Sequence, residues 1–246
     1  MKPEVEFVEF KKNDLKGFTL IEGYPGMGLV GTLAAKFLVE KKKFEYIGYI
    51  DSNTFAPVVR IHNAMPVRPA RIYSNKEKKI AVVLSEQVFS REVMHVLAKK
   101  TVDWIHSKGI KQLISLSGVN THSVEHKEII YGIAANETSK SILKKYGLKE
   151  IEDGITTGIT ALILLELRQS KTQAISILAN VNYGADYKAA AEILKKLDEI
   201  FGLSLNVQPL IEEAKEAERQ FLEQLERLQK TKDSAEKFET KTPLIT

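Results

Sequence analysis

The fold of this chain is decided by one stretch, Gly23-Tyr24-Pro25-Gly26-Met27-Gly28-Leu29-Val30-Gly31. The apolar residues 18–21 precede it and predict a buried strand, and residues 32–43 follow it with apolar side chains at helical spacing. Four glycines within nine residues, between a strand and a helix, predict a tight turn whose backbone closely approaches another group. That group is either a phosphate or a neighbouring strand, and the functional interpretation depends on which it is.

The phosphate alternative rests on a spacing. Gly26, Gly28 and Gly31 fit the pattern G-x-G-x-x-G, and Asp51 lies twenty residues after the last glycine, where dinucleotide-binding folds place a ribose-binding carboxylate. Pro25 argues against this alternative, because proline removes one N–H group from the turn. We therefore favour a structural turn and keep nucleotide binding as the alternative. The residues of the structural turn are Gly23, Pro25, Gly26, Gly28 and Gly31.

The composition limits the class of protein. Hydrophobic residues make up 43% of the 246 residues, which is enough for a sizeable core. The absence of cysteine excludes disulfides, thiol nucleophiles and thiolate metal sites. The net charge of +4 is too small to argue for nucleic acid, no N-terminal signal pattern is present, and the longest apolar stretch, residues 159–167, is too short to span a bilayer. We expect a cytoplasmic protein that binds neither nucleic acid nor a membrane.

Predicted strands alternate with predicted helices through most of the chain. Apolar runs and alternation predict strands at 5–10, 18–22, 44–50, 79–84, 110–116, 128–135 and 172–181, with two further extended pieces at 55–61 and 66–73. Helical spacing predicts helices at 32–43, 90–107, 139–146, 157–168 and 185–201. This order predicts an α/β fold in which a mainly parallel sheet is covered by helices on both faces. Such sheets bind ligands at the carboxyl ends of their strands.

The chain divides into three predicted parts. We expect residues 1–206 to form an α/β core domain, residues 207–230 a C-terminal helix and residues 231–246 a flexible tail. The helix carries an apolar stripe with a period close to seven residues, formed by Leu210, Ala214, Ala217, Phe221, Leu225 and Leu228. This stripe needs a partner surface, either on the core domain or on a second copy of the chain. We predict a closed homo-oligomer held partly by this helix, because closed symmetry is usual for soluble self-association.

The tail ends in apolar residues beside the terminal carboxylate. Residues 231–242 are mostly polar, and Leu244, Ile245 and Thr246 follow Pro243. A pocket with a lysine and apolar walls would bind such an end, which is one recognised mode of peptide capture. The alternative is an ordinary frayed terminus.

The sequence contains no recognisable set of catalytic residues. His122, Glu125 and His126 form the pattern H-x-x-E-H, but they lie in a polar stretch after a strand, whereas this zinc motif requires a helix. Ser117 lacks the G-x-S-x-G surroundings of a nucleophile elbow. No acid–base pair is indicated by the spacing of the carboxylates Asp51, Glu86, Asp103 and Asp153. We expect Glu86 to have a helix-capping or loop role, and we expect no enzyme activity, metal or cofactor.

The glycine turn belongs to a wider set of motifs. Together with Ser115-Leu116-Ser117-Gly118 and Gly154-Ile155-Thr156-Thr157-Gly158-Ile159, it resembles the proteasome assembly chaperone 2 family, and its archaeal homologues in particular. The resemblance spans residues 17–201. It implies a nucleoside-phosphorylase-like three-layer core and a role in chaperoning assembly of the 20S proteasome without nucleotide, although archaeal members are often labelled ATP-grasp enzymes. Pro25 fits the turn of this family better than a pyrophosphate cradle.

The resemblance also implies partners. It leads us to expect a homo-oligomeric, non-enzymatic protein that contacts proteasome α subunits or a paralogous chain. Several assembly chaperones and proteasome activators end in hydrophobic-Tyr-X, and in this chain Ile245 stands in place of the tyrosine. Docking of the tail between α subunits is therefore expected to be weak.

Overall fold

The computed structural model describes residues 2–121, 129–181, 184–213 and 216. Within these ranges the main sheet has nine strands, in the order β1-β3-β6-β7-β2-β8-β11-β9-β10. They are β1 (Val5–Glu9), β2 (Thr19–Gly23), β3 (Glu45–Ser52), β6 (Ala70–Asn75), β7 (Ile80–Ser85), β8 (Gln112–Val119), β9 (Ile130–Ala134), β10 (Lys149–Glu150) and β11 (Gln173–Asn180). A separate hairpin consists of β4 (Arg60–His62) and β5 (Met65–Val67). The helices are η1 (Met27–Leu29), α1 (Val30–Lys41), α2 (Arg91–Ser107), α3 (Glu137–Lys145), α4 (Gly158–Glu166) and α5 (Tyr187–Phe201).

The centre of the sheet is parallel and most pairs at its flanks are antiparallel. β7, β2, β8 and β11 are parallel neighbours. On one flank, β1 pairs with β3, β3 with β6 and β6 with β7, all antiparallel. On the other flank, β9 pairs antiparallel with β11. The prediction of a mainly parallel sheet is therefore confirmed for the four central strands and wrong for the flanks. The reason lies in the connections, because the short turn between β6 and β7 can join only antiparallel strands, whereas parallel strands need a long crossover.

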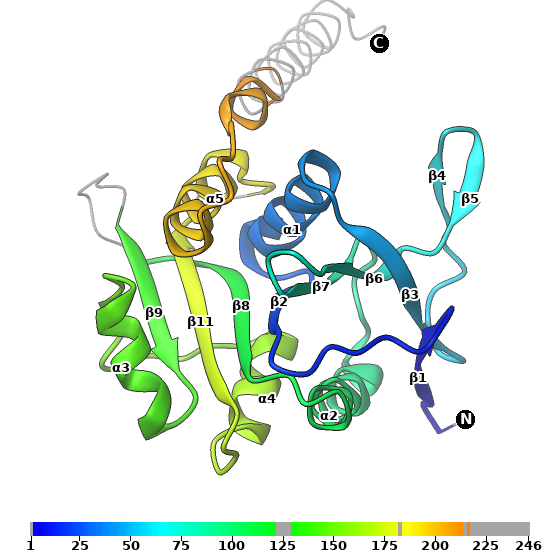
Figure 1. The fold of residues 1–246 in the computed structure, drawn as a ribbon, viewed down its shortest axis with the longest axis horizontal. Coiled ribbons are helices and arrows are strands. Elements are labelled where there is room, and N and C mark those ends of the chain that lie inside the picture. The colour runs from blue at the N-terminus through cyan, green and yellow to red at the C-terminus, as the bar shows by residue number, and fades with distance from the viewer. Residues whose placement is uncertain (1, 122–128, 182–183, 214–215, 217–246) are drawn as a thin grey trace, which may run out of the picture.

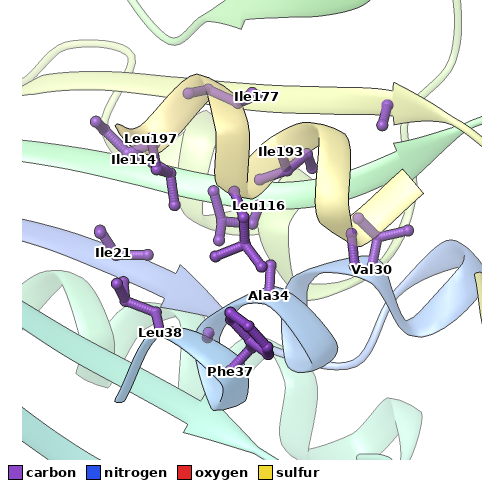
Figure 2. Close-up of a cluster of buried hydrophobic side chains, with 14 of the residues drawn as sticks. Ile21, Val30, Ala34, Phe37, Leu38, Ile114, Leu116, Ile177, Ile193 and Leu197 are labelled. Atoms are coloured by element: carbon purple, nitrogen blue, oxygen red, sulfur yellow. The ribbon is translucent and has the colours of Figure 1, made fainter. Parts of the chain in front are cut away.

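Helices cover both faces of the sheet and create two cores (Figure 1). α1 and α5 lie over one face, and α2 and α4 lie over the other. Figure 2 shows the first core, where side chains from the sheet meet those of the helices at Ile21, Ile114, Leu116, Ile177, Val30, Ala34, Phe37, Leu38, Ile193 and Leu197. The expected arrangement of a sheet between two helical layers is confirmed.

Two of the central strands, β2 and β7, are buried along their whole length, as their apolar runs predict. Every residue of β2 and of β7 is buried, because helices cover both faces of a parallel sheet. β2 nevertheless contains a carboxylate, Glu22, whose exposed fraction is 0%. A buried carboxylate in a central strand requires hydrogen-bond partners, and these partners belong to the site described below.

The chain beyond α5 returns to the core domain. Residues 208–213 are helical, and Leu210 is only 3% exposed, in the same core as α1 and α5. The first residue of the apolar stripe therefore packs within its own chain. Outside the described residues lie Ala214, Ala217, Phe221, Leu225 and Leu228 of the stripe and Leu244, Ile245 and Thr246 of the tail.

The glycine turn brings the backbones of α1, β2 and β8 into direct contact. A Cβ atom added at Gly31 would lie 2.3 Å from the carbonyl oxygen of Leu116, and one added at Gly23 would lie 2.4 Å from the Cβ atom of Ala35. Both distances are far shorter than a van der Waals contact. Close packing of a helix on two strands therefore requires these glycines, which supports the structural interpretation of the turn.

We predict that Gly31→Ala destabilises the fold. Helix propensity alone favours alanine by about 1 kcal/mol, but overpacking against a backbone carbonyl costs about 1–3 kcal/mol and forces α1 away from β8. Because the clashing atom belongs to the backbone, we expect a cost of about 3 kcal/mol, at the upper end of this range. After the gain in propensity, the net loss in the free energy of unfolding is about 2 kcal/mol, measured by urea denaturation.

Gly26→Ala is the matched control for this variant. Its φ of −143° suits alanine, and the added Cβ atom would lie 3.3 Å from the hydroxyl oxygen of Ser117. The control should therefore lose much less stability. Equal losses in the two variants would contradict the packing argument.

Candidate functional site

The loops that follow the central parallel strands converge at one edge of the sheet, here called the carboxyl edge. α1 follows β2, α2 follows β7 and α5 follows β11, so these helices all begin there. The β4–β5 hairpin joins β3 to β6 and stands out from the body of the domain (Figure 1). α4 also begins at this edge, because the Thr160 hydroxyl is 3.0 Å from the carboxyl of Glu22 near the end of β2. This is the edge at which α/β sheets bind ligands.

Tyr24 fixes the beginning of the glycine turn. Its buried ring stands edge-on to Phe89, with the ring centroids 5.5 Å apart, and its hydroxyl lies 3.1 Å from the hydroxyl of Thr101 on α2. Burial raises the pKa of Tyr24 well above its usual value, so the phenol stays protonated. The chain then reverses at Gly28, where φ is 66°, and leaves Met27 exposed.

The turn is filled by the protein's own atoms. A Cβ atom at Gly118, near the end of β8, would lie 2.5 Å from the carbonyl oxygen of Met27, and one at Gly28 would lie 3.0 Å from Val181. The N–H of Asp186, the residue that caps α5, donates to the Gly28 carbonyl oxygen over 2.8 Å. Contacts with β8 and with the start of α5 therefore account for the glycines without a ligand.

Asp51 does not approach the glycine turn. It lies on β3, and β6 and β7 separate β3 from β2 in the sheet, so roughly 14 Å lies between the two strands at the usual strand spacing. In dinucleotide-binding folds the strand with the carboxylate is the direct neighbour of the strand before the glycines. Asp51 instead pairs with Arg68, with 3.0 Å between Oδ1 and Nη1. The nucleotide-binding alternative is therefore wrong in placing Asp51 beside the turn.

Glu22 is a site residue that the sequence prediction missed. Its Oε1 accepts a hydrogen bond from the Tyr24 N–H at 2.7 Å, and its Oε2 accepts one from the Thr160 hydroxyl at 3.0 Å. Burial raises the pKa of this carboxyl, and the hydrogen bonds from Tyr24 and Thr160 lower it by a smaller amount. The available signal was a charged residue at the end of an otherwise apolar predicted strand.

Glu86 anchors the hairpin to the body of the domain. Its carboxylate pairs with Lys36 on α1 at 3.1 Å, with Arg60 on β4 at 3.2 Å, and with Arg71 on β6. Arg60 also pairs with Glu40 on α1 at 3.0 Å. These ion pairs hold β4 against α1 and the end of β7, so Glu86 has a structural role in its loop.

Exposed apolar side chains gather at the carboxyl edge. In the described part of the chain, ten large apolar side chains are exposed, and eight of them lie in the loops and the hairpin of this edge. These eight residues, here called the rim, are Met27, Leu29, Val58, Val59, Ile61, Met65, Val88 and Ile155. Val88 is 71% exposed, and Ile155, in the loop that leads into α4, is 95% exposed. Single exposed apolar residues are normal, but apolar groups gathered on one side of a protein mark an interaction site.

Two features are absent from the described part of the chain. It contains no group of three or more His, Cys, Asp or Glu side chains that could hold a metal ion. Each of its helices is also too short or too polar to cross a membrane. The H-x-x-E-H residues His122, Glu125 and His126 lie outside the described residues.

Known proteins resemble this chain in both sequence and fold. Residues 20–225 match the model of the PAC2 family. An uncharacterised protein of Methanocaldococcus jannaschii is 29% identical over 224 residues, which cover 91% of this chain and 92% of that protein. The crystal structure of Pyrococcus furiosus PbaA, described as an archaeal homolog of proteasome-assembly chaperone, superposes with a TM-score of 0.81 at 27% identity, covering 96% of this chain and 98% of that one.

A second solved structure agrees with the first. Pyrococcus furiosus PbaB, described as an archaeal proteasome activator, superposes with a TM-score of 0.77 at 25% identity, covering 92% of this chain and 100% of that one. The family match includes the glycine turn, the carboxyl edge and most of the chain around them. On this basis, the chain belongs to the PAC2 family.

Proposed function

We propose that this chain is a non-enzymatic, chaperone-like protein of proteasome assembly that contacts α subunits of the 20S proteasome, or a paralogous chain, through the rim. The gathering of exposed apolar side chains at the carboxyl edge is the observation that carries the proposal. Membership of the PAC2 family supports it, as do the descriptions of PbaA as a homolog of a proteasome-assembly chaperone and of PbaB as a proteasome activator. The ATP-grasp label has no support in these matches.

The rim has the chemistry of a protein-binding surface. It consists of Val, Leu, Ile and Met side chains, which gain free energy when a partner removes them from water. Complete burial of one such side chain contributes about 1.5–3 kcal/mol. Association costs about 4–15 kcal/mol in lost translational and rotational freedom. Burial of most of the rim, and not of one or two residues, is therefore needed for stable binding.

The fold holds much of the rim in place before a partner binds. Arg60 is fixed by Glu86 and Glu40, so the hairpin that carries Ile61 and Met65 is tied to α1. A surface that is already ordered loses less conformational entropy on binding than a mobile one. The anchored hairpin therefore suits the recognition of another protein.

We predict that rim substitutions weaken binding of α subunits. The double variant Val88→Asp and Ile155→Asp places two charges where the proposed interface is apolar, and burial of a charge without a partner is strongly unfavourable. We expect the dissociation constant to rise at least about tenfold, which corresponds to roughly 1.4 kcal/mol. Biolayer interferometry with purified α subunits measures this change.

Leu165→Asp is the control for the rim variants. Leu165 is 64% exposed on α4 but lies outside the rim, so the same chemical change there should leave binding unaltered. An equal loss of affinity in the control and in the rim variant would argue against the rim as the binding surface.

We also propose a homo-oligomer held by the C-terminal helix, residues 207–230. Because Leu210 is buried in its own chain, a subunit contact would use the later stripe residues. We predict that truncation after Glu213 keeps the core domain folded and lowers the mass measured by light scattering. Truncation after Lys230, which removes only the proposed tail, should keep the mass of the full chain. An unchanged mass after the first truncation would place the stripe within one subunit.

The last three residues are proposed to dock weakly on the partner. Leu244 and Ile245 offer apolar side chains beside the terminal carboxylate, but the position of Ile245 lacks the tyrosine hydroxyl of the hydrophobic-Tyr-X end. We predict that deletion of residues 244–246 lowers the affinity for α subunits by less than about tenfold, or 1.4 kcal/mol. Identical affinities would show that binding relies on the folded body alone.

A further inference from the structure

A buried carboxyl lies directly beneath the carboxyl edge. Glu22 is 0% exposed and belongs to the face of β2 that α4 covers, where it contacts Thr160. Its neighbours in register are Val83 on β7 and Ser115 on β8. No cation of the described residues contributes to its pKa. The carboxyl is therefore held by hydrogen bonds in surroundings that do not favour a negative charge.

The same carboxyl joins two segments that carry rim residues. One oxygen accepts from the N–H of Tyr24, the residue that begins the glycine turn, and the other accepts from Thr160 in the first turn of α4. Thr157, the N-cap residue of α4, makes no side-chain capping hydrogen bond. Glu22 therefore contacts the start of α4, although it lies more than one hundred positions earlier in the sequence. Met27 follows the first of these contacts in the chain, and Ile155 precedes the second.

No charged group of the described residues affects the pKa of Glu22. The titratable group that interacts with it is the Tyr24 phenol, which burial keeps protonated. The acids of the loop before α4, Glu152 and Asp153, are exposed. The other neighbours of Glu22 and Tyr24 have side chains that do not ionise. They are Val83 on β7, Ser115 on β8, Thr160 on α4 and, beside Tyr24, Thr101 on α2.

We propose that Glu22 is a positioning residue whose buried carboxyl ties the glycine turn to the start of α4 and so sets where the rim presents Met27, Leu29 and Ile155. The importance of that placement for binding rests on the proposed function, whereas the tie itself is a property of the isolated chain. A proton on the carboxyl removes the buried charge, and Ser115, its neighbour in register on β8, has a buried hydroxyl without a hydrogen-bond partner among the described residues. Loss of the proton leaves a buried charge without a cation, so the contribution of Glu22 to stability falls as the pH rises.

The first test compares wild type with Glu22→Gln in the full chain without a partner. Because the folded state holds a proton that the unfolded state releases above pH 4.5, the contribution of Glu22 to stability is complete below that pH. This contribution to stability decreases as the pH rises towards the raised pKa of the folded state, and it no longer changes above that pKa. The unfolding equilibrium constant of wild type should therefore rise relative to that of Glu22→Gln, by up to about tenfold per pH unit for one proton. Identical pH profiles for the two proteins would overturn the proposal.

The second test asks whether the hydrogen bonds position the segments. Glu22→Leu keeps most of the volume but leaves the Tyr24 N–H and the Thr160 hydroxyl without this partner. Hydrogen exchange at residues 24–29 and 155–161 should then accelerate at least about tenfold, the effect of losing one or two buried hydrogen bonds. The exchange rates of Glu22→Gln should stay close to those of wild type, because an amide can both accept hydrogen bonds from these groups and donate to them. Wild-type protection in Glu22→Leu would also overturn the proposal.

A binding measurement separates this inference from the proposed function. If wild type binds α subunits, Glu22→Leu should bind more weakly than Glu22→Gln, and equal affinities would contradict a role for the tie in presenting the rim. If wild type does not bind them, the proposed partner is wrong. The pH profile and hydrogen exchange would still decide whether Glu22 positions the turn and α4.

Discussion

The contact between the backbone of α1 and the ends of β2 and β8 is the constraint on which the rest of the structure depends. Gly31 approaches the Leu116 carbonyl so closely that a Cβ atom would lie 2.3 Å away. Thr32, the next residue, donates its hydroxyl to the Ser85 carbonyl oxygen of β7 at 3.0 Å and is 3.3 Å from the Gly23 carbonyl oxygen. The first turn of α1 is therefore fixed to three neighbouring strands, and the glycine turn has little freedom in its path.

This constraint explains why the edge combines buried polar groups with exposed apolar ones. Polar groups of the loops are satisfied inward: Glu22 accepts hydrogen bonds from Tyr24 and Thr160, and Glu86 pairs with Arg60. Polar groups used in this way stabilise the loops and are not available to a ligand. Apolar side chains of the rim remain on the outside, beside exposed polar groups such as Glu152 and Asp153, and they favour a partner with an apolar surface of its own.

The sequence predicts the elements of this fold better than their pairing. The apolar runs of β2 and β7 and the helical spacing of α2 and α5 appear in the structure as buried strands and helices, because burial on both faces leaves a local pattern. The structural interpretation of the glycine turn also agrees with the contacts of Gly23 and Gly31. The antiparallel flanks were not predicted, because the pairing of β3 with β6 depends on where the hairpin returns the chain.

The site was harder to predict than the fold. Glu22 and Thr160 are 138 positions apart, and Arg60 meets Glu86 across a hairpin whose direction no local pattern determines. The rim could not be predicted from local patterns either, because Met27, Val88 and Ile155 share an edge only after the parallel strands are aligned. Glu22 offered a local signal, a carboxylate in an apolar run, but its burial depends on the helix that covers it.

We propose the carboxyl edge as the surface that binds proteasome α subunits, and hydrogen exchange of the full chain, measured with and without saturating purified α subunits, is the decisive measurement. If α subunits bind there, new protection appears at residues 24–29, 58–67, 86–90 and 151–157, with no change at the turn between β6 and β7 on the opposite edge. Protection confined to that opposite edge, or no protection anywhere in the chain, would contradict the proposal.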